Sequence, residues 1–219
     1  MANIINKSFN AAVSPQGKAM WAKINSRIDE YEGKKKYSID VVFDKDGEQK
    51  MLDVINHALD EAKNSPEYSG KVWRNDTDRL SYHDEVDKDG NETGNLVFHF
   101  QTKAYMRDRE TGEEVQKIIP VFSNEEKRKL NKDESIGNGS MVRIKFTPSA
   151  YWMNKSSNGI NLYLSKIVVD KWVKFGGGDD DFSEFGIGTD DAFLSDEDIP
   201  IWLMIGEHGI NHVPLFVLP

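Results

Sequence analysis

GSMVRIKFTPSAYWMNKSSNGINLYLSKIVVDKWV, residues 139–173, is the most informative segment of this chain. Its first half alternates apolar residues with cationic ones, which predicts a strand with one buried face and one exposed, cationic face. The apolar row is Val142, Ile144 and Phe146, and the cationic row is Arg143 and Lys145. The connection at 154–159 is rich in Asn, Ser and Gly and can reverse the chain. The segment therefore predicts a β-hairpin.

Aromatic residues cluster beside this cationic row. Tyr151 and Trp152 fall in the expected connection, and Tyr163 lies in the returning strand. Cations hold phosphates and flat rings stack on unpaired bases, so the surface suits a single nucleic-acid strand. An ordinary β-hairpin with scattered surface residues fits the hairpin taken alone equally well.

The composition is that of a globular protein with a polar surface. The chain has 219 residues, of which 38% are hydrophobic and 30% charged, enough for one sizeable core. No run of about 18 apolar residues occurs, and the opening MANIINKSFN lacks a signal-peptide pattern, so we expect a cytoplasmic protein without a membrane partner. The absence of cysteine excludes disulfides, thiolate metal sites and cysteine nucleophiles.

Charge is divided unevenly along the chain. All 28 Lys and Arg lie at or before Lys174, whereas 10 of the 37 Asp and Glu follow it, so residues 1–175 carry 28 − 27 = +1 and residues 176–219 carry −10. Such a division predicts an acidic tail that recruits partners or competes with an anionic ligand for a basic surface on the body.

Upstream, alternation predicts strands at 3–13 and 18–28, separated by a turn at 14–17. In the second strand we expect an inward row and an outward tryptophan, Trp21, beside cations. The inward row is Met20, Ala22 and Ile24.

The next elements are a strand and a helix. Tyr37 to Asp44 reads as a strand preceded by the basic run 34–36, and a turn at 44–47 ends it. An apolar stripe at helical spacing predicts a helix over 48–63. Residues 64–94 are polar and predict a long loop with one short strand at 72–74.

Alternation returns at 95–107 and predicts a strand with two distinct faces. Leu96, Phe98, Phe100, Thr102 and Ala104 form the inward row, and His99, Gln101, Lys103, Tyr105 and Arg107 the outward row. Residues 115–122 are expected to pair back as a hairpin. The strand count and the single inserted helix favour a mainly β oligonucleotide-binding (OB) barrel; a β-sandwich fits the count nearly as well.

The composition changes at Gly176. Three glycines form a hinge, and the acidic segment that follows cannot bury a core, so we expect a folded domain over 1–175 and a disordered acidic tail over 176–219. The apolar end, 199–219, is interrupted by Glu207 and by Gly and Pro, and is not expected to span a membrane.

No catalytic or metal-binding pattern is present. Residues 87–91 resemble the start of a calcium loop, but its required glycine and glutamate positions hold Glu92 and Phe98. No phosphate-cradling loop or nucleophile elbow occurs. We therefore expect no enzyme activity and no cofactor.

The segments GSMVRIKF and GINLYLSKIVV, with the tail motifs Asp179-Asp180-Asp181-Phe182 and 195–200, make the chain similar to the replicative single-stranded DNA-binding proteins of tailed bacteriophages. The resemblance implies an OB barrel that coats single-stranded DNA during replication, recombination and repair in the host cytoplasm. It also implies an acidic tail that engages DNA polymerase, helicase or other replication proteins, and it leaves a homodimer possible. The chain departs from the family pattern after residue 200, where mostly apolar residues follow the acids.

Two sets of site residues follow from these patterns. The expected DNA contacts are Trp21, Lys34, Lys35, Lys103, Tyr105, Arg107, Arg143, Lys145, Tyr151, Trp152 and Tyr163. The expected partner-binding tail residues are Asp179, Asp180, Asp181, Phe182, Phe185, Asp190, Asp191, Phe193, Asp196, Glu197 and Asp198. The alternative hypothesis is an acidic interaction adaptor whose β-barrel never binds DNA.

Overall fold

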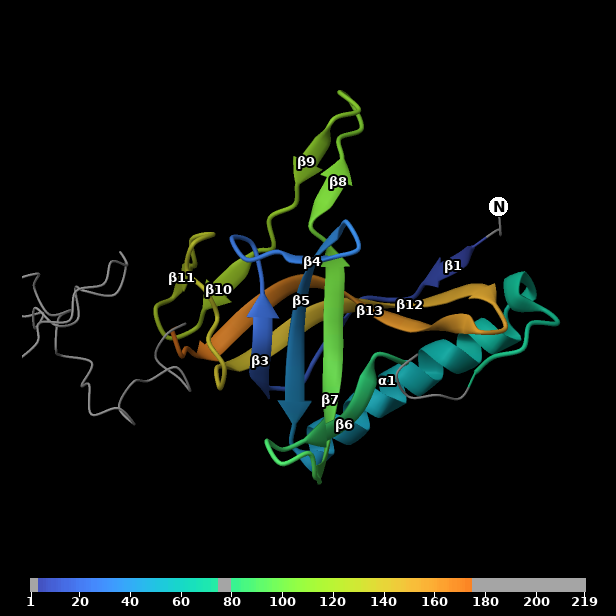
Figure 1. Ribbon diagram of the computed structural model, residues 1–219, viewed down its shortest axis with the longest axis horizontal. Helices are drawn as coiled ribbons and strands as arrows, with labels where there is room; N and C mark the ends of the chain where they lie inside the picture. The colour runs from blue at the N-terminus through green and yellow to red at the C-terminus, as the bar shows by residue number, and fades with distance from the viewer. Residues whose placement is uncertain (1–3, 75–79, 175–219) are drawn as a thin grey trace, which may run out of the picture. The chain divides into compact units, whose positions relative to one another are not determined.

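A computed structural model describes residues 4–74 and 80–174. Its elements are β1 (Ile5–Ser8), β2 (Ala12–Val13), β3 (Gly17–Lys23), β4 (Asp29–Tyr31), β5 (Lys34–Phe43), α1 (Lys45–Asn64), the 3-10 helix η1 (Pro66–Tyr68), β6 (Tyr82–Val86), β7 (Glu92–Lys103), β8 (Tyr105–Arg107), β9 (Glu114–Gln116), β10 (Val121–Ser123), β11 (Arg128–Lys129), β12 (Met141–Asn154) and β13 (Ser157–Lys171). Figure 1 shows β3, β5 and β7 side by side, with α1 extending to the right from their lower ends.

The sheet closes on itself. Hydrogen bonding runs β12-β3-β5-β7-β13, and β13 pairs back with β12, which gives a closed five-stranded barrel. The β7–β13 contact is parallel, and the other four contacts of the ring are antiparallel. The expected OB barrel with one inserted helix is confirmed.

The long hairpin β12–β13 supplies two strands of this ring and much of its core. The inward row expected at Val142, Ile144 and Phe146 is fully buried. The turn is shorter than expected, because β12 runs to Asn154 and β13 begins at Ser157. Tyr151 and Trp152 therefore belong to a strand and not to a connection, which corrects the sequence-based expectation.

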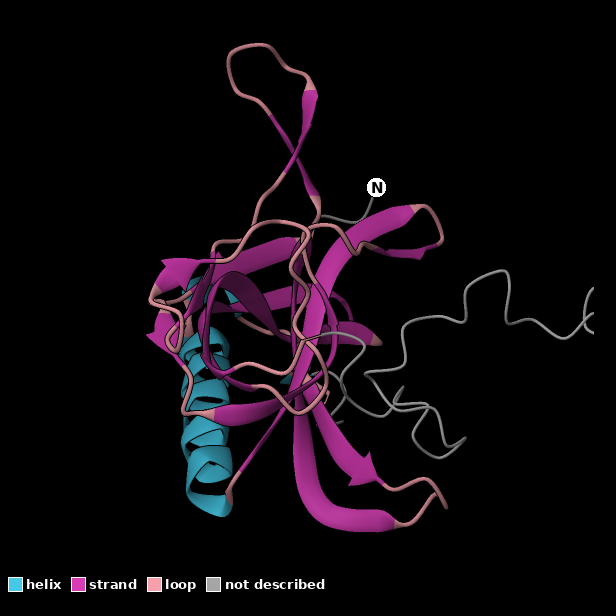
Figure 2. Cartoon of the chain, turned by 90° about the vertical axis from the view of Figure 1, so that its left-hand side faces the viewer, coloured by secondary structure: helices cyan, strands magenta, loops and turns pink. Residues whose placement is uncertain are grey.

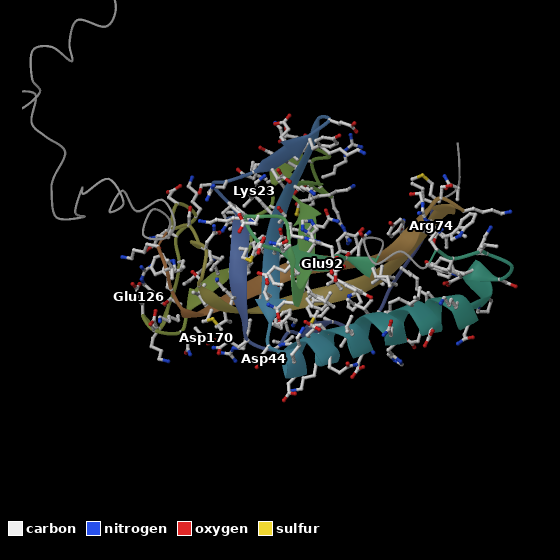
Figure 3. All side chains as sticks on the ribbon, turned by 60° about the horizontal axis from the view of Figure 1, so that its bottom comes forward. Lys23, Asp44, Arg74, Glu92, Glu126 and Asp170 are labelled. Atoms are coloured by element: carbon white, nitrogen blue, oxygen red, sulfur yellow. The ribbon has the colours of Figure 1, made fainter. Side chains whose placement is uncertain are left out.

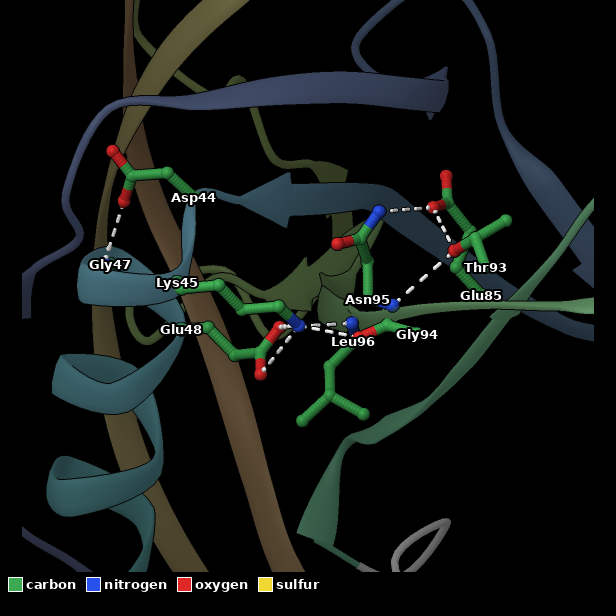
Figure 4. A network of polar contacts seen from close by, with 9 residues as sticks. All are labelled: Asp44, Lys45, Gly47, Glu48, Glu85, Thr93, Gly94, Asn95 and Leu96. Carbon is green, nitrogen blue, oxygen red and sulfur yellow. Dashed lines mark hydrogen bonds and ion pairs between the residues drawn. The ribbon is translucent and has the colours of Figure 1, made fainter.

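Helix α1 begins earlier than predicted. Asp44 caps it by accepting a hydrogen bond of 2.7 Å from Gly47 N, so residues 44–47 start the helix instead of forming a turn. Glu48 then accepts from the backbone N–H of Leu96, which ties the first turn to β7, as Figure 4 shows. The apolar stripe packs into the barrel through Met51, Ile55, Ala58, Leu59 and Ala62.

Two other segments differ from expectation. Residues 72–74 are not a strand; instead β6 forms at 82–86 and pairs with β7. Residues 115–122 divide: β9 pairs back with β8, but β10 pairs in parallel with β13. Strands β8 and β9 form a separate two-stranded sheet that projects from the barrel, which Figures 1 and 2 show at the top of each view.

The N-terminal segments are also more broken than predicted. The strand expected at 3–13 is two short strands, β1 and β2, both paired with β12. In β3 the inward residue is Ala19 and not Met20, because the register shifts between Met20 and Lys23 where Trp21 adopts a φ of 51°. Ala22 and Ile24 are buried as expected.

Candidate nucleic-acid interface

An open groove of about 610 Å³ crosses the outer face of β5, β7 and β13. Alternation along β7 sends Phe100 into the barrel and leaves Gln101 and Lys103 outside. The three consecutive lysines 34–36 form the start of β5, before its buried residues begin. The lining residues are Gly33, Lys34, Lys35, Lys36, Gln101, Thr102, Lys103, Tyr105, Glu114, Asn161 and Tyr163. Four lysines and two tyrosines thus meet in one depression, five of these six having been expected from the sequence.

The lysines of this groove differ in their partners. Lys36 lies 3.7 Å from Asp29, and Lys35 lies 3.9 Å from Glu30, so both are partly neutralised. Within the described part of the chain, Lys34 and Lys103 form no ion pair and are exposed. These two ammonium groups are therefore the ones most available to an incoming phosphate.

Tyr105 stands where the projecting β8–β9 ribbon leaves the barrel. The Lys35 ammonium lies 5.6 Å from the centre of its ring. Arg107 is two residues further along β8, on the same face of the ribbon as Tyr105, opposite Glu114 of β9. Since Tyr105 and Glu114 both line the groove, the groove face continues onto the ribbon toward Arg107.

The groove continues as a second depression of about 400 Å³. Gln101 and Asn161 line both parts and so join them. The full lining of the second part is Ser81, Tyr82, His83, His99, Gln101, Tyr151 and Asn161. His99 Nδ1 lies 2.6 Å from Asp40 Oδ1, which fixes its ring against β5.

Tyr151 and Trp152 are placed differently, because neighbouring residues of a strand point to opposite faces. Tyr151 lines the groove. Trp152 does not; its Nε1 donates to Val72 O, and the Lys71 ammonium lies 4.3 Å from its ring centre. Trp152 thus already has a cation on its ring.

Tyr68 anchors β12 directly beneath Tyr151. Its hydroxyl donates to Ala150 O at 3.1 Å, and its ring is buried. Burial raises the pKa of Tyr68 to about 12, so it stays protonated and keeps donating at physiological pH.

Arg143 and Lys145 do not line the groove. Arg143 makes two hydrogen bonds to Asp170, of 2.7 and 2.6 Å, and hydrogen bonding from Arg143 is the main cause that holds the pKa of Asp170 below its ordinary value. Figure 3 shows Asp170 at the opposite end of the β12–β13 hairpin from Arg74. Lys145 is exposed between Val13 and Lys166 on the neighbouring strands. Their expected role in DNA contact thus has no support from the groove.

Trp21 is exposed, as predicted, with 64% of its surface accessible. Its backbone N–H donates to Asn138 Oδ1, which holds the irregular β3 segment in place. It lines neither part of the groove, so it stands apart from Tyr105, Tyr151 and Tyr163.

The groove residues that the sequence reasoning left out of the site include Lys36, Gln101, Asn161 and His99. The alternation along β7 already placed His99 and Gln101 on the same outward face as Lys103, so the sequence did contain a pattern that could have identified these two residues. Gln101 and Asn161 were missed because an amide carries neither the charge nor the ring that marked the other candidates, and Lys36 was left out although it belongs to the basic run 34–36. The tail residues named above, Asp179 to Asp198, lie outside the described residues.

Among residues 4–74 and 80–174 no group of three or more His, Cys, Asp or Glu could hold a metal ion. None of the helices in the described ranges is long and apolar enough to cross a membrane.

A closed five-stranded barrel with a groove across its outer face defines a member of the OB-fold class. Comparison with known proteins gives its family. The profile of the family described as single-stranded DNA-binding protein, bacteriophage T7, matches residues 18–171, well over half of the chain. The chain belongs to this family of phage single-stranded DNA-binding proteins, as the resemblance implied.

Individual relatives are distant. The single-stranded DNA-binding protein of Escherichia phage T7 is 27% identical over 95 residues, a match that spans 43% of this chain and 40% of that protein. The crystal structure of gp2.5, a single-stranded DNA-binding protein encoded by bacteriophage T7, has 20% identity and a TM-score of 0.55 over 86% of this chain and all of that one. The single-stranded DNA-binding protein from bacteriophage Enc34 in complex with single-stranded DNA has 19% identity and a TM-score of 0.53, covering 74% and 86% of the two chains. These structures share the fold.

Proposed function

We propose that this protein binds single-stranded DNA along the groove, without catalysis and with tolerance for sequence. The observation that carries the proposal is the gathering of Lys34, Lys35, Lys36 and Lys103 with Tyr105 and Tyr163 in one depression. Ammonium groups release counterions from the phosphates, and exposed rings offer faces to unpaired bases.

Membership of the family supports this function, and the Enc34 relative has been solved with single-stranded DNA. The biological role that follows is to coat and protect single strands during phage DNA replication and recombination in the host cytoplasm. The chemistry of the groove does not call for a nucleophile or a metal, which agrees with a binding protein that has no turnover.

The acidic tail extends the proposal. Residues 179–198 carry nine acids and no base. A tethered polyanion has a high effective concentration at a nearby cationic surface, so the tail competes with DNA for the lysines of the groove. When DNA displaces it, the acids and the interspersed Phe182, Phe185 and Phe193 become available to replication proteins such as a polymerase or helicase.

The test is a titration of labelled oligo-dT, followed by fluorescence anisotropy at several salt concentrations. The double variant Lys34→Ala/Lys103→Ala removes the two unpaired ammonium groups. For two lost phosphate contacts, the slope of log K against log salt falls by about 1.4.

The matched control is Lys50→Ala/Lys88→Ala, which removes the same charge from exposed residues outside the groove. It leaves the slope unchanged. Duplex DNA of the same length binds much more weakly, since its bases are already stacked. Absence of strand binding even at low salt overturns the proposal and favours the interaction-adaptor alternative.

A further inference from the structure

The two ends of the groove are chemically different. Its lysine end holds the four lysines described above. Its other end, lined by Ser81, Tyr82, His83, His99 and Tyr151 with Gln101 and Asn161 at the junction, includes no lysine or arginine among the described residues. A phosphate placed at this second end finds no lysine or arginine to neutralise it, whereas an uncharged base has no charge to neutralise.

The junction offers hydrogen-bond donors. Gln101 Oε1 accepts from Lys36 Nζ at 3.3 Å, which leaves the Gln101 Nε2 group to donate. Asn161 lies on the adjacent strand β13, two residues before Tyr163, which pairs with Gln101. Within the described residues its side-chain amide has no hydrogen-bond partner, although the residue is half buried. No protein group occupies this amide, so it can exchange water for an acceptor on a ligand.

The walls of this end are fixed. Ser81 is buried with a φ of 63°, its hydroxyl donates to Ile160 O at 2.7 Å, and its carbonyl accepts from His99 N. These bonds hold the start of β6 against β13 and β7. Tyr151 closes the opposite side from β12, whose backbone Tyr68 anchors. The end is therefore preformed, with a ring on one wall and amides at its floor.

We infer that this end of the groove recognises a nucleobase, with Gln101 and Asn161 donating to a base carbonyl and Tyr151 against the ring, while the lysine end takes the phosphates. The inference rests on the proposed function and adds a base preference to it. A carbonyl oxygen has two lone pairs and can accept from both amides, whereas a ring nitrogen can accept from only one. Thymine, cytosine and guanine therefore bind this end better than adenine, which has no carbonyl.

The test compares oligo-dT with oligo-dA of equal length at one salt concentration. Gln101→Met and Asn161→Leu keep the side-chain volume but remove the donors, and thermal melting checks that each variant is folded. Each lowers the ratio of the dA to the dT dissociation constant by about 2- to 10-fold relative to the unsubstituted protein, the worth of one hydrogen bond. The salt slope stays the same.

Two controls separate this inference from the proposed function. Gln49→Met makes the same substitution on the exposed face of α1 and changes neither ratio nor slope. Lys35→Met lowers the slope by about 0.7 without changing the dA to dT ratio. An unchanged ratio in both amide variants, with dT binding intact, overturns the base-recognising end and leaves DNA binding standing. Failure of the unsubstituted protein to bind either strand overturns both.

Discussion

Tyr163 and Tyr151 face the groove from neighbouring strands, and each offers a ring that no cation covers among the described contacts. Tyr163 has 37% of its surface exposed at the lysine end, so it is the ring most open to a base. Stacking of one base on such a ring contributes about 1–3 kcal/mol. The two tyrosines divide the groove between them, one at each end.

We therefore predict that Tyr163→Ala weakens oligo-dT binding by about 1–3 kcal/mol, measured by anisotropy at fixed salt. Phe122→Ala is the matched control, because Phe122 is 39% exposed on β10 and does not line the groove. Equal losses in the two variants would show that general destabilisation, and not stacking, accounts for the effect.

Asp170 contributes to the stability of the fold and not to the groove. It accepts hydrogen bonds from Arg143, Gln16 and Asn124, which joins β13 to β12, to the turn before β3 and to the segment after β10. Its pKa is lowered, chiefly by Arg143, so its contribution is present above the ordinary value of 3.8 and is lost as the pH falls through the lowered value.

Asp170→Asn should thus lower the free energy of unfolding at pH 7 by about 1–3 kcal/mol, measured by urea denaturation. The gap between variant and unsubstituted protein should narrow as the pH falls below 3.8 and close once it passes the lowered pKa of Asp170, below which both side chains are neutral. Asp133→Asn, at an exposed position, is the control and should show no gap at either pH. A gap that persists unchanged in acid would contradict the assignment.

Among the elements, helix α1 depends on a single side chain for its start. Asp44 accepts from Gly47 N, and a methyl group added to Gly47 would lie 2.9 Å from Asp44 Oδ1 and 3.0 Å from Phe43 Cβ. The Asp44 side chain therefore leaves little room for a side chain at position 47. The cap also fixes where Glu48 meets β7 (Figure 4).

Asp44→Ala is expected to cost about 0.5–2 kcal/mol of stability, measured by thermal or urea unfolding. Asp46→Ala removes the same charge from the first turn without removing the cap, so the difference between the two isolates the hydrogen bond. Strand binding should be unchanged in both at temperatures where they are folded. Equal costs would mean that charge near the helix terminus, and not the cap, is responsible.

The elements show where sequence reasoning succeeded and where it failed. Alternation identified the inward rows of β7 and β12, because burial on one face imposes a period of two. It could not reveal that Asp170 engages Arg143 or that Lys71 covers Trp152, since those contacts join distant parts of the chain. It also treated residues 44–47 as a turn, because an aspartate before a glycine can either turn the chain or cap a helix.

For the whole molecule, the uneven charge is the dominant property. The full chain has a net charge of −9, and a chain cut after Phe175 carries +1. At low ionic strength such a difference acts over tens of ångströms, whereas at high salt it is screened. The proposed competition between tail and DNA is therefore strongest in dilute buffer.

Truncation after Phe175 is predicted to tighten oligo-dT binding at low salt, with the gain shrinking as salt rises. Anisotropy titrations of the full and truncated chains across a salt series measure this. A full-length variant with the nine acids of 179–198 changed to Asn or Gln serves as control and should match the truncated chain. If the full and truncated chains bound oligo-dT with equal affinity at low salt, the tail would not compete with DNA. Its remaining roles would then be partner recruitment or solubility.

Strand β13 joins β7 on one side and β12 on the other, and so completes the ring. During biosynthesis β13 emerges after every other strand of the barrel. Strand β12 pairs with β3 at Met141 and Lys18, two residues that lie far apart in the sequence. A nascent chain that lacks β13 thus holds an open sheet in which one edge of β12, and one edge of β7 at Phe100 and Gln101, are unpaired. Such edges invite association with other chains. The barrel can close only after residues 157–171 have been synthesised. Until then the partly made chain can pair wrongly with other chains.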